Sequence, residues 1–205
     1  MNASSPSADG MFSRGLIAAV AAMCGVVALS NFAVQHPFML FGLQDYFTWG
    51  TFTYPLAFLI TDLTNRRYGP AMTRRVVFAG FVLAVILSVV LATPRIAIAS
   101  GTAFLTAQLL DVSVFDRLRQ SAWWKAPLVS SLIGSAVDTA MFFTLAFAGT
   151  GMPEATYPVL GGITAPVWMG WAFFDWLAKL ACAGAMLVPF RALMSRITPL
   201  RAAAS

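Results

Sequence analysis

Residues 48–69 read TWGTFTYPLAFLITDLTNRRYG, an apolar run that ends in two adjacent arginines. A helix needs roughly 20 apolar residues to cross the hydrocarbon core of a bilayer, which is about 30 Å thick. Comparable runs follow one another along the chain. The sequence therefore predicts six membrane-spanning segments: Gly15–Val34, Thr48–Leu63, Val76–Ala92, Ile96–Phe115, Ala126–Ala148 and Thr164–Pro189.

The composition agrees with this pattern. Of the 205 residues, 59 % are hydrophobic and 10 % are charged, whereas a soluble domain carries about 25 % charged residues. We therefore predict an all-α, polytopic integral membrane protein. Residues 1–13 are expected to be a disordered cytoplasmic tail, residues 14–191 a six-helix transmembrane domain, and residues 192–205 a basic cytoplasmic tail.

The basic residues predict the orientation. If the N-terminus is cytoplasmic, 11 of the 13 Lys and Arg residues fall on the cytoplasmic side, as Lys and Arg in short loops prefer. Both termini are then cytoplasmic, Arg95 lies outside, and Lys179 lies within the last segment. The bases sit at the ends of apolar runs and form no stripe, so the net charge of +5 does not indicate nucleic-acid binding. Cleavage of a signal peptide after Ala28-Leu29-Ser30 is the alternative, but the loop charges alternate correctly with six segments.

Charged groups inside the apolar runs are the functional candidates, because a charge within a bilayer is costly. Asp62, Asp111 and Asp138 are three of them. Asp175 and Lys179 are four residues apart, a spacing that pairs them on one helix face. Each has a structural alternative: Asp62 could sit at the interface and pair with Arg66, and Asp175–Lys179 could be an inert internal ion pair. Asp138 follows a stripe of small residues suited to helix packing.

Motifs for catalysis are absent from the sequence. It has no metal-ligand cluster, nucleophile elbow or phosphate loop, and its single histidine, His36, precedes a proline in an external loop. We therefore expect no enzyme activity, no catalytic residues, no cofactor and no metal. Without a nucleotide-binding motif, a secondary transporter or a facilitator remains.

Five blocks carry a family resemblance: SNFAVQHP (30–37), TWGTFTYPLAFLITDLTNRRYG (48–69), QLLDVSVFDRLRQSAWWKAP (108–127), SSLIGSAVDTAMFF (130–143) and FDWLAKL (174–180). They resemble the queuosine precursor transporter family, also called the putative vitamin uptake transporter family. The resemblance implies a bacterial inner-membrane importer of 7-cyano-7-deazaguanine, 7-aminomethyl-7-deazaguanine or queuine, which supplies tRNA queuosine modification. The chain departs from the family in its short link at Thr93–Arg95.

Such a substrate suits the candidate residues. A guanine-like base offers a ring N–H and an amine to a carboxylate, and aromatic side chains stack on its ring. We expect Asp62, Asp111 or Asp138 to accept these bonds. Gln108 and Asn31 could meet the carbonyl, while Trp49, Phe52 and Tyr54 could stack. Asp175 and Lys179 would form a gating or proton-coupling pair.

The partners expected are the small-molecule base and the lipid bilayer. The apolar segment Val76–Ala92 suits lipid and a homodimer partner equally. The alternative function is a membrane subunit that captures a vitamin-like compound and needs an energising partner. An intramembrane enzyme would need a catalytic cluster, which His36 and scattered aspartates do not make.

Overall fold

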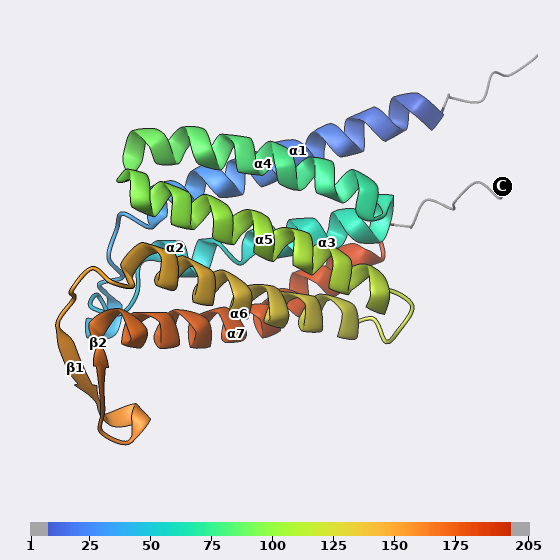
Figure 1. The fold of residues 1–205 in the computed structure, drawn as a ribbon. Helices are drawn as coiled ribbons and strands as arrows, with labels where there is room; N and C mark the ends of the chain where they lie inside the picture. The colour runs from blue at the N-terminus through green and yellow to red at the C-terminus, as the bar shows by residue number, and fades with distance from the viewer. Residues whose placement is uncertain (1–7, 198–205) are drawn as a thin grey trace, which may run out of the picture.

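Five long helices form the bundle of this computed structural model, which describes residues 8–197. They are α1 (Ala8–Ala33), α4 (Pro70–Leu91), α5 (Pro94–Leu118), α6 (Lys125–Phe147) and α7 (Val167–Met194). All five are long and apolar enough to cross a membrane, and they run side by side (Figure 1). The prediction of an all-α, polytopic membrane protein is confirmed.

The expected second segment is divided into two short helices, α2 (Trp49–Thr53) and α3 (Leu56–Tyr68). The division falls at Pro55, which has no N–H and cannot bond the carbonyl of the residue four positions earlier. The N–H of Tyr54 still donates to the carbonyl of Gly50 at 2.9 Å, so α2 ends there. Pro55 therefore interrupts the helix, and α3 continues five residues beyond the predicted end at Leu63.

The turn between α3 and α4 follows from one glycine and one proline. Gly69 adopts a φ of 80°, a conformation that favours glycine, and its N–H donates to the Asn65 carbonyl at 2.9 Å. Pro70 then opens α4, where its fixed φ suits the first helical turn. Pro94 opens α5 in the same way.

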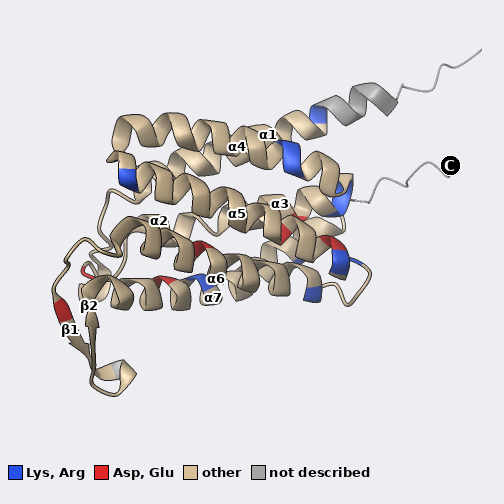
Figure 2. Cartoon of the chain, viewed as in Figure 1, with Lys and Arg blue, Asp and Glu red and all other residues tan. Residues whose placement is uncertain are grey.

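The helix ends extend the predicted segments. α1 begins at Ala8, so residues 8–13 are helical although they were expected in a disordered tail. The remainder of that tail, residues 1–7, and most of the expected basic tail, residues 198–205, lie outside the described residues. The start of α1 and the end of α7 lie at one end of the bundle (Figure 1). Most Lys and Arg residues gather at this same end (Figure 2), which we call the basic end.

A β-hairpin before α7 was not predicted. Strands β1 (Glu154–Tyr157) and β2 (Ile163–Pro166) pair antiparallel, with Glu154 opposite Pro166, and a 3-10 turn, η2 (Pro158–Leu160), lies between them. The sixth segment was expected to start at Thr164, which is in β2, so the true helix starts three residues later. The Tyr157 hydroxyl donates to the Val167 carbonyl at 2.7 Å. Its ring covers Gly170, where a Cβ would lie 2.1 Å away, so only glycine leaves room for the hairpin to dock.

Arg95, the exception in the charge pattern, has a structural role at the opposite end of the bundle. Its Nε and Nη2 donate to the carbonyls of Leu145 (3.0 Å) and Ala148 (2.5 Å) at the end of α6. Helix C-termini leave carbonyls without partners, and cations there are favourable. Arg95 therefore ties the start of α5 to the end of α6.

The apolar core lies between α1, α4 and α5, around Met23, Val76 and Phe104. The outward face of α4 is apolar too, with Val82, Val89 and Val90 between 56 % and 77 % exposed. A continuous exposed apolar surface of this kind marks membrane contact. The helix thus separates a protein-facing side from a side suited to lipid.

Candidate functional site

A cavity of about 360 Å³ opens among the helices, toward the end opposite the basic end. The loop Gln44–Phe47, which precedes α2, forms part of its wall together with α1, α2, α5, α6 and α7. Its volume falls in the range of small-molecule sites, about 300–1,000 Å³. Its ionisable and aromatic lining consists of Asp45, Asp138, Asp175, Lys179, Tyr46, Phe47, Tyr54, Phe142, Phe143, Phe147 and Trp171.

Three buried charges lie on this cavity, and we call Asp138, Asp175 and Lys179 the cavity triad. Lys179 Nζ lies 2.8 Å from Asp138 Oδ2 and 2.6 Å from Asp175 Oδ2. The Asp175–Lys179 pair predicted from spacing is confirmed, and Asp138 joins it from α6. Buried charges persist where they are paired and hydrogen-bonded, but two carboxylates against one ammonium leave one excess negative charge.

Thr139 completes the triad, although the sequence analysis did not select it. Its hydroxyl donates to Asp175 Oδ2 at 2.9 Å and accepts from Lys179 Nζ at 3.1 Å. The signal available in the sequence was its position next to Asp138. A buried Thr at that position can meet the same cation as its neighbour.

Tyr54 reaches the triad from the end of α2. Its hydroxyl lies 3.4 Å from Asp138 Oδ1, and Lys179 Nζ lies 5.6 Å from the centre of its ring. Helix α2 ends at Thr53, so Tyr54 lies at the break between α2 and α3, next to Pro55. This position brings the Tyr54 side chain to the triad. Asn31 also lines the cavity, but its side chain is engaged by the Val27 carbonyl and by Ser88.

Trp49 and Phe52 lie outside the cavity lining. Both pack against Phe38, each with a ring-centre distance of 4.8 Å. Their rings therefore support the loop before α2 and do not face the cavity. The aromatic surface of the cavity comes from other rings, among them Phe142 and Trp171. Helical spacing could have identified Phe142, since it follows Asp138 by four residues on the same face of α6.

The other predicted polar residues form a second cluster, in the seam between α3, α5 and α6. Asp62 and Asp111, which we call the seam pair, are 2 % and 0 % exposed, and their carboxyl groups lie close enough to interact. Ser130 donates to Asp62 Oδ1 at 3.3 Å. Gln108, also fully buried, accepts from the Thr61 hydroxyl at 2.5 Å. None of these residues lines the large cavity.

No ion pair joins Asp62 or Asp111 to a cation among the side chains that the structure describes, which begin at Arg14. The alternative that Asp62 pairs with Arg66 at the interface is therefore wrong. Asp116, by contrast, pairs with Arg119 at 3.1 Å near the surface, as expected for a carboxylate at the edge of the membrane.

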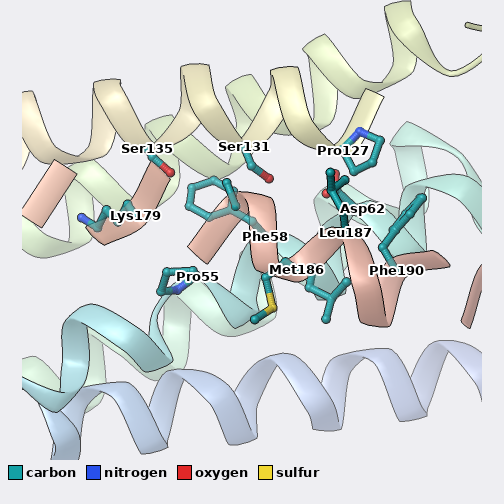
Figure 3. A pocket seen from close by; sticks show the side chains of 12 residues that line it. Pro55, Phe58, Asp62, Pro127, Ser131, Ser135, Lys179, Met186, Leu187 and Phe190 are labelled. Carbon is teal, nitrogen blue, oxygen red and sulfur yellow. The ribbon is translucent and has the colours of Figure 1, made fainter. Parts of the chain in front are cut away.

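A narrow crevice runs between Lys179 of the cavity triad and Asp62 of the seam pair (Figure 3). Lys179 lines both the cavity and the crevice, and Asp62 lines the crevice. The crevice holds only about 10 Å³, space for roughly one water molecule. Phe58 lies between Lys179 and Asp62 (Figure 3) and packs so closely on α6 that a Cβ at Gly134 would lie 2.7 Å from its ring. The route from the cavity toward the basic end is thus closed.

For a metal, the described residues 8–197 offer no group of three His, Cys, Asp or Glu side chains placed to hold an ion. The site combines stacking surfaces with fixed hydrogen-bond acceptors. That arrangement suits reversible binding of a small polar ring.

Comparison with known proteins also identifies similar transporters. Residues 48–93 and 87–194 match the family described as "Putative vitamin uptake transporter". The chain is 36 % identical to the "Queuosine precursor transporter" of Escherichia coli (strain K12), with 80 % of this chain and 79 % of the relative covered. It is 36 % identical to the "Probable queuosine precursor transporter" of Haemophilus influenzae over the same shares, and 28 % identical to that of Bacillus subtilis (strain 168), over 74 % and 72 %. No solved structure matches the chain.

Proposed function

This chain belongs to the putative vitamin uptake transporter family, and on that premise we propose that it imports queuosine precursors across the bacterial inner membrane. The resemblance predicted from its motifs is confirmed. The observation that carries the proposal is the cavity itself, which combines buried carboxylates with aromatic walls. The substrates proposed are 7-cyano-7-deazaguanine, 7-aminomethyl-7-deazaguanine or queuine, with no catalytic step.

The triad carboxylates supply the acceptors for such a base. Asp175 Oδ2 is engaged by Lys179 and Thr139, but Asp175 Oδ1 has no hydrogen-bond partner among residues 8–197. Asp138 Oδ1 meets only Tyr54, at 3.4 Å. A ring N–H and an adjacent amine can donate to these oxygens, and bonds to a charged acceptor are about twice as strong as neutral ones. Tyr54, Phe142 and Trp171 then provide the stacking surface.

The charge of the cavity favours a cationic or donor-rich substrate. The triad carries one excess negative charge, and Asp45 adds another at the rim. A primary amine on the base would balance this charge. Among the three precursors, the aminomethyl compound has that group, so we propose it as the preferred one.

Transport requires the cavity and the crevice to open in turn. We propose that the α2–α3 pair makes the sixth crossing, which accounts for the start of α1 and the end of α7 lying at the same end of the bundle (Figure 1). With the basic end cytoplasmic, the cavity faces the outside and the crevice leads inward. The helix interruption at Pro55 lets α2 and α3 move separately, and displacement of Phe58 would open the inner route.

The test is queuosine in tRNA from a bacterial host that neither makes nor imports the precursors and expresses only this chain. Each precursor is supplied in turn at low concentration. We expect modified tRNA with the wild-type chain. We expect a loss of about 10-fold or more in initial uptake for Asp138→Asn, because a bond to a charged acceptor contributes about 1.5–3 kcal/mol.

Asp116→Asn is the matched control, since Asp116 lies outside the cavity and pairs near the surface. It should transport like wild type. No modification with any precursor, despite wild-type protein in the membrane, would overturn the proposal and favour a subunit that needs an energising partner.

A further inference from the structure

The seam pair is the largest buried polar feature that the proposed cavity does not use. It lies on α3 and α5, away from the cavity lining, and it is more deeply buried than the triad. We propose that Asp62 and Asp111 hold one proton between their carboxyl groups, and that this proton enters the cell together with the substrate. The inference rests on the proposed import function and names its coupling ion.

The first argument is the missing countercharge. Neither oxygen of Asp111 lies within hydrogen-bonding geometry of a described donor. The groups that act on its carboxyl are the Ser130 hydroxyl and the Asp62 carboxyl, and neither of them is a cation. Two neighbouring carboxylates shielded from water cannot both stay ionised, so such a pair shares a proton. With one proton bound, one carboxyl can donate to the other.

The second argument comes from two amides in the same seam. Gln108 Nε2 and Asn65 Oδ1 are buried and have no partner within residues 8–197. Both side chains are fixed between α3 and α5, Gln108 by Thr61 and Asn65 by the Val112 carbonyl at 2.9 Å. Native interiors leave few polar atoms unmatched. A seam with a spare donor and a spare acceptor beside the carboxyl pair is suited to a group that gains and loses a proton.

The third argument is space, which selects a proton over a metal ion. Asp111 borders neither cavity described above, and the crevice beside Asp62 holds only about 10 Å³. A metal cation in an oxygen site needs about six ligands around it, whereas a proton adds no volume. Asp62 and Asp111 can therefore take a proton in the closed bundle.

The surrounding charges leave the pair electrically isolated. From α6, only the hydroxyls of Ser130 and Ser131 face Asp62. From α7, Lys179 lines the shared crevice, but it is committed to the cavity triad. Arg119, which follows the last residue of α5, and Arg66 of α3 lie nearer the basic end and form no ion pair with Asp62.

The crevice also gives the proton a route to the substrate site. Lys179 lies at the boundary of cavity and crevice, and Asp62 lies further along the crevice. When Phe58 moves, water can connect them. The pair would then release its proton toward the basic end, in the same movement that frees the substrate.

The test uses the purified full chain in liposomes, with a pH-sensitive dye inside and labelled 7-aminomethyl-7-deazaguanine outside. For wild type we expect substrate entry to acidify the lumen, and an inward proton gradient of one pH unit to accumulate substrate several-fold. For Asp111→Asn and Asp62→Asn we expect accumulation to fall to a ratio of about one, while exchange of labelled for unlabelled substrate continues. Asp116→Asn should behave as wild type.

The outcomes separate two failures. If wild type neither accumulates nor exchanges any precursor, the proposed function fails. If wild type transports without acidifying the lumen, or follows a sodium gradient instead, the proton proposal is overturned while import stands. Accumulation by Asp111→Asn at the wild-type level would also overturn it. If neither variant folds, carbodiimide labelling of wild type decides: an adduct at Asp62 or Asp111 that increases as the pH falls supports the proposal, and none at either overturns it.

Discussion

The cavity triad and the seam pair both bury two carboxyl groups between helices, but only the triad has a cation. In the triad, Lys179 bonds both acids within 2.8 Å. In the seam, Asp111 has no partner for either oxygen. The triad is thus a charge-paired wall of the cavity, whereas the seam pair has no countercharge. In the mechanism proposed above, the triad contacts the substrate and the seam pair holds the proton, with Phe58 lying between Lys179 and Asp62.

The largest effect is expected when the cation of the triad, Lys179, is removed. Lys179→Met leaves Asp138 and Asp175 buried without a countercharge, and losing one partner of a buried ion pair costs about 3–5 kcal/mol. We expect a loss of that size in the free energy of unfolding, measured by SDS titration in mixed micelles, together with a loss of uptake. Lys125→Met, at the exposed start of α6, is the control. A change below about 1 kcal/mol for Lys179→Met would contradict the described triad.

Neutralising all three charges of the cavity triad tests whether the loss of stability comes from the unpaired carboxylates. Lys179→Met combined with Asp138→Asn and Asp175→Asn eliminates the unpaired charge, and neutral replacements of buried ion pairs are often tolerated. We expect the triple variant to regain at least half of the stability lost by Lys179→Met, in the same SDS titration. Uptake should stay absent because the acceptors have lost their charge. A triple variant that transports would show that the triad is structural.

The third prediction is a difference in sign between the clusters. Asp111→Asn should leave the free energy of unfolding unchanged or raise it by about 1 kcal/mol, because the amide can donate to Asp62 without a bound proton, whereas the buried carboxyl pair needs one. Asp138→Asn should lower the free energy of unfolding, because it weakens the hold on Lys179. The SDS titration at neutral pH compares the two directly. Equal destabilisation by both would remove the distinction drawn here.

The smallest effect is expected at the surface. Asp116→Asn breaks the Asp116–Arg119 ion pair, whose side chains are about one-third exposed, and such pairs contribute about 0–1 kcal/mol. We expect a change within about 0.5 kcal/mol and unchanged uptake. A larger change would mean that Arg119, which also donates to the Asn65 and Arg66 carbonyls, depends on Asp116 for its position.

The sequence predicted the positions of the long helices better than which side of each helix faces the protein. Apolar runs identified the five long helices because length and composition suffice. Pro55 is the residue in the second segment that accounts for its break. The β-hairpin was missed, although Gly161-Gly162 between two short runs is a turn signal, because the residues after it were absorbed into the last helix. The sequence did not predict which face of each helix points into the bundle. The lipid-facing and protein-facing sides are both apolar here, so hydrophobic periodicity carries little information.

For the same reason, the site was predicted only in part. Asp175 and Lys179 are four residues apart on one helix, so spacing alone paired them. The contact between Asp138 and Lys179 spans 41 residues and depends on how α6 meets α7. Whether Asp111 faces the cavity or the seam depends on the rotation of α5. The sequence therefore named the buried acids without separating them into two clusters.

The two hydrogen bonds from Arg95 to the end of α6 have a consequence for biogenesis. Arg95 is the second residue of α5, but its acceptor carbonyls, on Leu145 and Ala148, are made about fifty residues later. During insertion, a guanidinium placed against the usual charge bias waits in water or among lipid head groups until α6 has crossed. A nascent chain that stops after α5 has nothing in the protein to hold Arg95. The α5–α6 hairpin is therefore the smallest unit of the chain in which these two hydrogen bonds can form.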